Sequence, residues 1–148
     1  MIYWLLILFI VLIDQWSKKK ALSFLNKHGG PYKLGKRLQL QLAKNTGSFY
    51  GMLKGKKKLI IVVNLFTIIG CVVLLYLGIQ DEKSSYNLGF SFLLGGAIGN
   101  LIDRIKKGYV IDFIFFKVKR GPIFNLADVF ILIGALILCY YEIFYGIF

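Results

Sequence analysis

Apolar residues occur along this 148-residue chain in four long stretches, with polar residues gathered between them. The clearest stretch, 59–79, contains no charged residue and is long enough to cross about 30 Å of hydrocarbon as a helix. A glycine-rich stretch at 86–104, an N-terminal stretch at 1–22 and a C-terminal stretch at 123–145 complete the set. The pattern predicts an all-α integral membrane protein, with four transmembrane helices forming a single domain over residues 1–148.

The first and last of these stretches are unusual because each contains a carboxylate. The uninterrupted apolar run at the N-terminus would cover only about 20 Å as a helix, so a full crossing must include Asp14. The last span must likewise include Asn125 and Asp128. Ionisable side chains within a membrane are costly and are usually paired or functional, so these positions are candidates for a site.

Four crossings put both termini on one side of the membrane and the two longer loops, 23–57 and 105–122, on the other side. Counting along the chain then brings four aspartates, two asparagines and an arginine to the loop side. These residues are Asp14, Asn100, Asp103, Arg104, Asp112, Asn125 and Asp128. A spacing of four residues also puts Lys18 on the same helix face as Asp14. Mutual satisfaction at a helix interface is the alternative explanation for any single member.

Composition supports the membrane assignment, since hydrophobic residues make up 57% of the chain and the mean hydropathy is +0.68. The formal net charge of +12 indicates anionic membrane lipids as partners, whereas the long apolar segments argue against binding to nucleic acid. The basic residues concentrate in the two longer loops, which the positive-inside rule would place in the cytoplasm. With one histidine and two isolated cysteines, we expect no metal and no cofactor.

Paired aspartates are the strongest candidate chemistry, because no nucleophilic triad and no nucleotide-binding loop is recognisable. Two close carboxylates share a proton, and such a pair can act as general base on water and general acid on a leaving amine. Peptide hydrolysis is an activity that fits. A cluster of acids can also bind a cation, so a small membrane cation-binding transporter or channel subunit is the alternative.

Five short motifs resemble, in order along the chain, those of the lipoprotein signal peptidases (signal peptidase II). They are DQWSK at Asp14–Lys18, NTGS at Asn45–Ser48, GGAIGNLIDR at Gly95–Arg104, VIDF at Val110–Phe113 and FNLAD at Phe124–Asp128. The chain departs from the family's NxGxxF loop motif, in which it has Phe49 and Tyr50. The ordered set covers nearly the whole chain, so the resemblance is specific.

The resemblance implies a bacterial membrane aspartyl endopeptidase. Such an enzyme removes signal peptides from diacylglyceryl-modified prolipoproteins and cleaves before the lipidated cysteine. Asp112 and Asp128 match the family's catalytic residues. Substrate-binding roles fall on Asn45, Asn100, Arg104 and Asn125, and supporting roles fall on Asp14, Lys18, Gly47 and Asp103.

The resemblance also implies a place in the cell and a further structural element. We expect a multi-pass monomer in the bacterial cytoplasmic membrane, with its active site toward the extracytoplasmic face. We also expect a small extracytoplasmic β-cradle in the first long loop. Leu38, Leu40 and Leu42 alternate there with polar residues, as in a half-buried strand.

Overall fold

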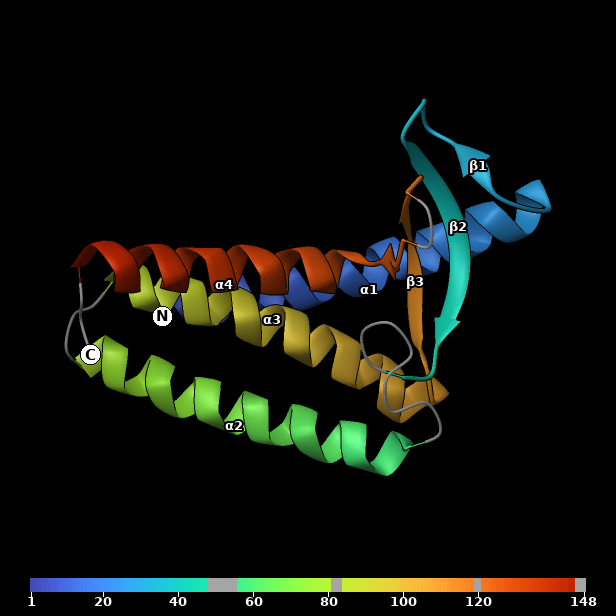
Figure 1. Cartoon of the computed structure of the whole chain (residues 1–148). Helices are drawn as coiled ribbons and strands as arrows, with labels where there is room; N and C mark the ends of the chain where they lie inside the picture. Colours follow the sequence, from blue (N-terminus) through green and yellow to red (C-terminus); the bar gives the residue numbers. More distant parts are fainter. Residues whose placement is uncertain (48–55, 81–83, 119–120, 146–148) are drawn as a thin grey trace.

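The computed structural model describes residues 1–47, 56–80, 84–118 and 121–145, which form four helices and a small sheet (Figure 1). The helices are α1 (Ile2–His28), α2 (Lys57–Gln80), α3 (Ser84–Lys107) and α4 (Leu126–Tyr145). The strands are β1 (Tyr32–Lys33), β2 (Leu38–Asn45), β3 (Val110–Phe116) and β4 (Ile123–Phe124). The sheet lies at one end of the helices, and the start of α1 and the end of α4 lie at the other end (Figure 1). Phe49 and Tyr50 lie outside the described residues.

Three helices in the described part of the chain are long and apolar enough to cross a membrane. They are Lys57–Gln80, Tyr86–Lys107 and Leu126–Tyr145. The expected fourth span, α1, is not among them, because Asp14 and the consecutive lysines Lys18–Lys20 interrupt its apolar run. α1 also continues to His28, beyond the end expected near residue 22, and Gly29 in the left-handed conformation terminates it.

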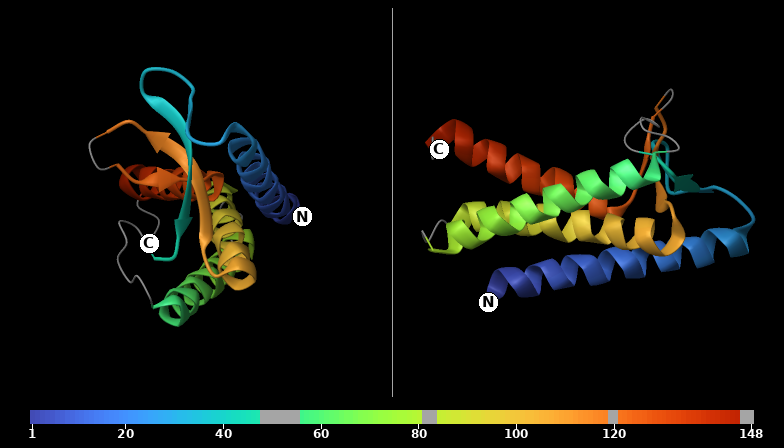
Figure 2. Two further views of the ribbon diagram at one scale, coloured as in Figure 1. Left: turned by 90° about the vertical axis from the view of Figure 1, so that its right-hand side faces the viewer. Right: turned by 90° about the horizontal axis from the view of Figure 1, so that it is seen from below.

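α3 is the central helix, and it packs against α1, α2 and α4 (Figure 2). Its glycines allow this close approach, because a side chain would collide with the neighbouring helix. A Cβ atom at Gly96 would lie 2.5 Å from the carbonyl oxygen of Ala127 in α4. One at Gly99 would lie 2.6 Å from the carboxylate of Asp14 in α1. Gly96 and Gly99 therefore lie at the contacts of α3 with α4 and α1.

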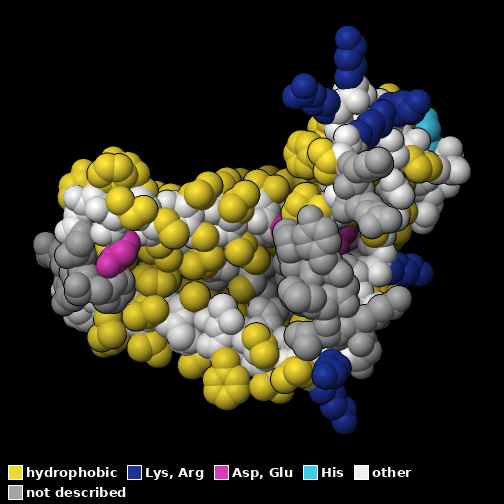
Figure 3. Space-filling view, in the orientation of Figure 1, with side chains coloured by type: hydrophobic (Ala, Val, Ile, Leu, Met, Phe, Trp, Pro, Cys, Tyr) yellow, Lys and Arg dark blue, Asp and Glu magenta, His cyan; other side chains and the backbone are white. Residues whose placement is uncertain are grey.

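The surface along the helices is apolar, and the basic side chains gather at the sheet end (Figure 3). Large hydrophobic side chains such as Phe66 and Leu136 are more than half exposed. A contiguous apolar surface of this kind is typical of a protein that contacts lipid. The sides of the bundle are thus suited to a hydrocarbon environment and the sheet end to a polar one.

The four strands are ordered β1-β2-β3-β4, and every neighbouring pair is antiparallel. The sequence predicted strands in the first long loop only, but β3 and β4 come from the segment between α3 and α4. The apolar run of β3 does not alternate with polar residues, and its partner β2 lies far away in the sequence. Because residues 123 and 124 form β4, α4 begins at Leu126 and not at the predicted residue 123.

Candidate active site

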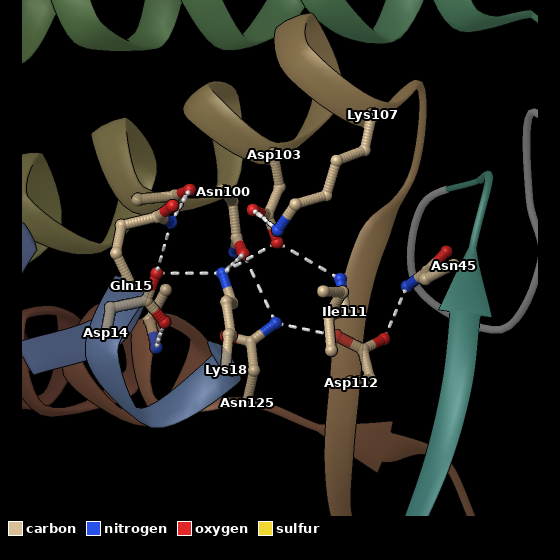
Figure 4. Close-up of polar contacts among 12 residues, drawn as sticks. Asp14, Gln15, Lys18, Asn45, Asn100, Asp103, Lys107, Ile111, Asp112 and Asn125 are labelled. Carbon is tan, nitrogen blue, oxygen red and sulfur yellow. Dashed lines mark hydrogen bonds and ion pairs between the residues drawn. The ribbon is translucent and has the colours of Figure 1, made fainter. Parts of the chain in front are cut away.

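Polar residues from α1, α3, α4 and the sheet meet where the helices reach the sheet (Figure 4). α1 contributes its middle, α3 its last turns and α4 its first turn. β2 and β3 close the cluster from the side of the sheet. Four of the cluster's side chains, Asp14, Lys18, Asp103 and Asn125, have no exposed surface. The predicted convergence of the aspartates at one end of the bundle is present in the structure.

Asp112 lies on β3 and is 2% exposed. Asn125 Nδ2 donates a hydrogen bond to its Oδ1 (2.6 Å), and Asn45 Nδ2 donates one to its Oδ2 (3.0 Å). Burial raises the pKa of Asp112 to about 6, and the negative charge of Asp128 acts in the same direction. The two amide donors and the charge of Lys18 oppose this rise in the pKa of Asp112. The carboxyl group of Asp112 is therefore able to bind a proton near neutral pH.

Asp128 lies in the first turn of α4, where it forms a reciprocal cap with Asn125. The backbone N–H of Asp128 donates to Asn125 Oδ1 (3.0 Å), and the backbone N–H of Asn125 donates to Asp128 Oδ2 (3.2 Å). This arrangement is a capping box, which explains why the two residues are three positions apart. It leaves Asp128 Oδ1 to accept a hydrogen bond from Asn100 Nδ2 (2.9 Å).

Asn100 and Asn125 connect the two carboxylates through their amide groups. Asn125 Nδ2 donates to Asn100 Oδ1 (3.2 Å) as well as to Asp112. Lys18 Nζ donates to the same oxygen of Asn100 (3.1 Å). With its oxygen held by two donors, the amide nitrogen of Asn100 is directed to Asp128. The network thus fixes the orientation of both asparagine side chains.

Beneath the two amides is a buried ion-pair cluster. Lys18 Nζ lies 2.8 Å from Asp14 Oδ2 and 3.5 Å from Asp103 Oδ2. Asp103 Oδ1 also pairs with Lys107 Nζ (2.8 Å), and its Oδ2 accepts a hydrogen bond from the backbone N–H of Ile111 (3.1 Å). Asp103 thereby joins the end of α3 to the start of β3.

Asp14 joins α1 to α4 in a comparable way. Its Oδ1 accepts a hydrogen bond from the backbone N–H of Ala127 (3.0 Å), which lies in the first turn of α4. The first N–H groups of a helix have no partner within the helix, and a negative charge there is favourable. Asp14 and Asp103 therefore hold the elements that carry Asp128 and Asp112.

A groove of about 840 Å³ opens beside the network, between α2, α3, α4 and the sheet. Its polar wall includes Asn45, Asn100, Arg104 and Asp128. The rest of its wall is largely apolar, and α2 and α4 supply much of it, including Ile60, Val63, Val129, Ile131 and Leu132. The lining of the groove suits a largely apolar ligand with a polar part.

The structure brings all ten candidate site residues to this end of the molecule. Nine of them lie in the network or line the groove, and Gly47 donates its backbone N–H to Asn45 Oδ1 (3.0 Å). Three contributors did not emerge from the sequence. Gln15 Nε2 donates to the carbonyl oxygen of Gly99 (3.1 Å), and Lys107 and the N–H of Ile111 contact Asp103. Only Lys107, four residues after Asp103, has a spacing that could have indicated its role.

Among the described residues, no group of three histidine, cysteine, aspartate or glutamate side chains is arranged to hold a metal ion. Cys71 is buried among apolar side chains, and Cys139 is exposed on α4. The lone histidine, His28, stacks on Phe24 with ring centroids 5.1 Å apart. The functional groups that the structure places at the site are two carboxyl groups with amide and guanidinium neighbours.

Comparisons with known proteins agree with the motifs. A family model of signal peptidase (SPase) II matches residues 6–144. The chain is 42% identical over 142 residues to the lipoprotein signal peptidase of Caldanaerobacter subterraneus subsp. tengcongensis, a match that covers 95% of each chain. It is 36% identical over 144 residues to that of Enterococcus faecalis, covering 96% of this chain and 88% of the relative.

Two solved structures, each described as a bacterial membrane enzyme, have the same fold. One has a TM-score of 0.81 at 28% identity and covers 95% of this chain and 87% of its own. The other has a TM-score of 0.80 at 27% identity and covers 97% and 93%. The chain therefore belongs to the signal peptidase II family, the peptidase class that its motifs indicated.

Proposed function

We propose that this signal peptidase removes signal peptides from lipid-modified prolipoproteins by an aspartyl mechanism, cutting before the lipidated cysteine. Family membership supports the substrate class, because the relatives are lipoprotein signal peptidases. The mechanism is supported chiefly by one observation. Two carboxyl groups, Asp112 and Asp128, interact electrostatically and accept hydrogen bonds from neutral amides, and among the described residues neither has a direct ion pair.

Asp112 and Asp128 act as a pair that holds one proton. The ionised member takes a proton from a water molecule, whose oxygen forms a bond to the scissile carbonyl carbon. The protonated member donates to the nitrogen of the leaving amine as the C–N bond breaks. The pair ends with one proton again, so the reaction needs neither a metal nor an external acid.

Four polar residues around the pair bind and orient the substrate. Asn45, Asn100 and Asn125 hold the two carboxylates in place, and Arg104 lines the groove near them. Among the carboxylates, Asp128 has the strongest electrostatic interaction with the positive charge of Arg104, and Asp112 has the next strongest. In our proposal the guanidinium binds substrate carbonyl oxygens, while the apolar walls of the groove accept the hydrophobic parts of the substrate.

The membrane arrangement is also part of the proposal. α1 is the fourth span, and it tolerates Asp14 and Lys18 because both are buried and neutralise each other within the protein. The three other helices, which are long and apolar enough to cross a membrane, complete the four spans. The single domain works as a monomer in the cytoplasmic membrane, with the sheet and the active site on the extracytoplasmic side.

Replacing either member of the pair tests the mechanism. Asp112→Asn and Asp128→Asn should each reduce cleavage of a diacylglyceryl-modified signal peptide by at least roughly 10²–10⁴-fold, because an amide cannot relay the proton. Cleavage is measured in detergent, with circular dichroism and thermal unfolding to check the fold. Glu142→Gln, at the opposite end of the bundle, is the control and should keep full activity. Full activity in either aspartate variant would rule out the pair.

A metal-dependence test separates this proposal from the cation-binding alternative. Activity on the same lipopeptide should be unchanged across a titration with a strong chelator, since the carboxylate pair supplies both proton transfers. Restoration of lost activity by a divalent ion would instead indicate metal-bound water as the nucleophile. Wild-type protein is titrated in parallel with chelator already saturated with the divalent ion, so that an effect of the chelator other than metal removal is recognised.

A further inference from the structure

The exposed side of α1 carries a stripe in which aromatic and basic residues alternate. Trp16, Lys20, Phe24 and Lys27 are four, four and three residues apart, so they share one face of the helix. Trp16 is 60% exposed and Phe24 is 40% exposed, and both lysines are exposed as well. We refer to these four residues as the α1 stripe. The opposite face of this part of α1 is buried against the protein and consists of Asp14, Ser17, Lys18, Ala21 and Leu25.

Within the α1 stripe Lys20 contacts Trp16, and Phe24 contacts aromatic rings just beyond the stripe. Lys20 Nζ lies 6.0 Å from the centre of the Trp16 ring. Phe24 stacks on His28 and meets Tyr32 edge-on, with ring centroids 5.1 and 5.2 Å apart. Tryptophan and tyrosine rings flanked by lysines are typical of the level where a membrane's hydrocarbon meets its headgroups.

The length of α1 places the stripe at that level. Its 27 residues span about 40 Å, whereas the hydrocarbon layer is about 30 Å thick. α1 extends past the other helices at the sheet end, in both views (Figures 1 and 2). The same face toward the N-terminus carries Leu5, Phe9 and Leu12, which are 58–61% exposed. An apolar track therefore leads directly to the cationic stripe.

The positive charge of this end of the molecule has no counter-charge on the protein surface. Within the described ranges, the carboxylates at this end are Asp14, Asp103, Asp112 and Asp128, and all four are engaged in the buried network or the groove wall. The β1–β2 segment adds the exposed Lys33, Lys36 and Arg37, and Figure 3 shows basic side chains gathered at this end. The counter-charge for the stripe must therefore come from outside the protein.

We propose that the α1 stripe binds the headgroups of anionic phospholipids, with the acyl chains lying along Leu5, Phe9 and Leu12. Lys20 and Lys27 contact the phosphate, and Trp16 packs at the boundary between headgroup and chain. The stripe is on the face of α1 that points away from the groove, so the lipid would be a bound partner of the enzyme and not its substrate. The inference is independent of the catalytic assignment.

The two tryptophans of the chain, Trp4 and Trp16, stand near opposite ends of the apolar part of α1 and allow a matched test. A Trp4→Phe variant, with Trp16 as its only tryptophan, is reconstituted in phosphatidylcholine vesicles that contain a fixed fraction of brominated lipid. Each lysine near an anionic surface strengthens binding of an anionic lipid over a neutral one by roughly fivefold, before salt screens the charges. Brominated phosphatidylglycerol should therefore quench Trp16 at least about threefold more effectively than brominated phosphatidylcholine.

Two further variants complete the test. Adding Lys20→Gln and Lys27→Gln to the Trp4→Phe variant should bring the ratio of the two quenching efficiencies close to one. Trp16→Phe, which leaves Trp4 as the reporter, should also give a ratio close to one. Both variants should cleave the lipopeptide normally in detergent, which shows that they are folded.

Three results would overturn the proposal. The first is equal quenching of Trp16 by the two brominated lipids. The second is a preference for the anionic lipid that survives loss of both lysines or is equally strong at Trp4. The third is loss of the preference when inorganic phosphate is added at constant ionic strength, which would indicate a general phosphate site and not a lipid site.

Discussion

At the scale of single residues, the four aspartates at the sheet end fall into two kinds. Asp14 and Asp103 each lie within 2.8 Å of a lysine ammonium group, so their charges are neutralised in direct ion pairs. In the described part of the chain, the hydrogen-bond donors in direct contact with Asp112 and Asp128 are all uncharged. Amides hold a carboxyl group in place without fixing its charge, which leaves it free to gain and lose a proton. This difference separates the supporting pair from the proposed catalytic pair.

The raised pKa of Asp112 leads to a prediction for the pH dependence of the reaction. A pair that must hold one proton gives a bell-shaped profile, whose alkaline limb reports loss of that proton. The groups that act on the pKa of Asp112 are Asp128, Lys18, Asn125 and Asn45. Since Asn45 stabilises the ionised form of Asp112, Asn45→Ala should raise this pKa and shift the alkaline limb to higher pH, by up to about one unit. The measurement is kcat/KM against pH on one lipopeptide.

Gln41 provides the matched control for this experiment. It lies on the same strand as Asn45, and its side chain accepts a hydrogen bond from Gln39 and makes no bond to Asp112. Gln41→Ala should therefore leave the limbs of the profile where they are in the wild-type enzyme. If Asn45→Ala also left them in place, the hydrogen bond from Asn45 would have no influence on the proton of the pair.

The sequence predicts which residues gather at the site but not how they bond. The set of residues at the site follows from counting spans, because residues at helix ends on the same side of the membrane must come together. The bonding pattern does not follow, since Asn100 and Asn125 each have several possible acceptors within reach. Asn125 caps α4 and also donates a hydrogen bond to Asp112. The second of these bonds depends on the position of β3, which local sequence does not determine.

At the scale of elements, the helices were predictable and half of the sheet was not. Long apolar runs are sufficient to identify helices in a membrane protein, because backbone groups must be satisfied within each span. β1 and β2 lie within one loop, where alternation in Leu38–Leu42 indicated a strand. β3 depends on pairing with β2 across α2 and α3, and the two-residue β4 pairs with β3, so no local pattern distinguished them from the end of a helix.

The packing of α3 gives a prediction at this scale. Gly96→Ala should destabilise the protein by about 1–3 kcal/mol, because the added methyl group meets the backbone of Ala127, which cannot move without shifting α4. Gly70→Ala in α2 is the matched control, since a Cβ atom there meets nothing within 4 Å. The control should be neutral or stabilising by up to about 1 kcal/mol. Thermal unfolding in one detergent compares the two, and equal stabilities would show that the α3–α4 contact is loose.

At the scale of the whole molecule, the helices separate two surfaces of different charge. The sheet end has exposed lysines from α1, the β1–β2 segment, the start of α2 and the end of α3. The far end carries Glu142, which accepts a hydrogen bond from Tyr86. Basic loops normally stay in the cytoplasm, whereas the proposed function requires the sheet end to face outward. The distribution of charge and the proposed function therefore make opposite predictions about orientation.

We expect the function to prevail, with the sheet end outside, because the lipidated cysteine of the substrate is at the outer leaflet. The positive-inside rule is a bias and not a strict requirement, and anionic lipids can offset the exposed charge on either side. A reporter enzyme that is active only outside the cytoplasm should be active when inserted near Gly55 and inactive when fused after Phe148. The reverse pattern would put the sheet in the cytoplasm and would contradict the proposed orientation. Activity at both positions would mean that one of the three helices between them, α2, α3 or α4, does not complete a crossing, and the four-span arrangement would then be wrong.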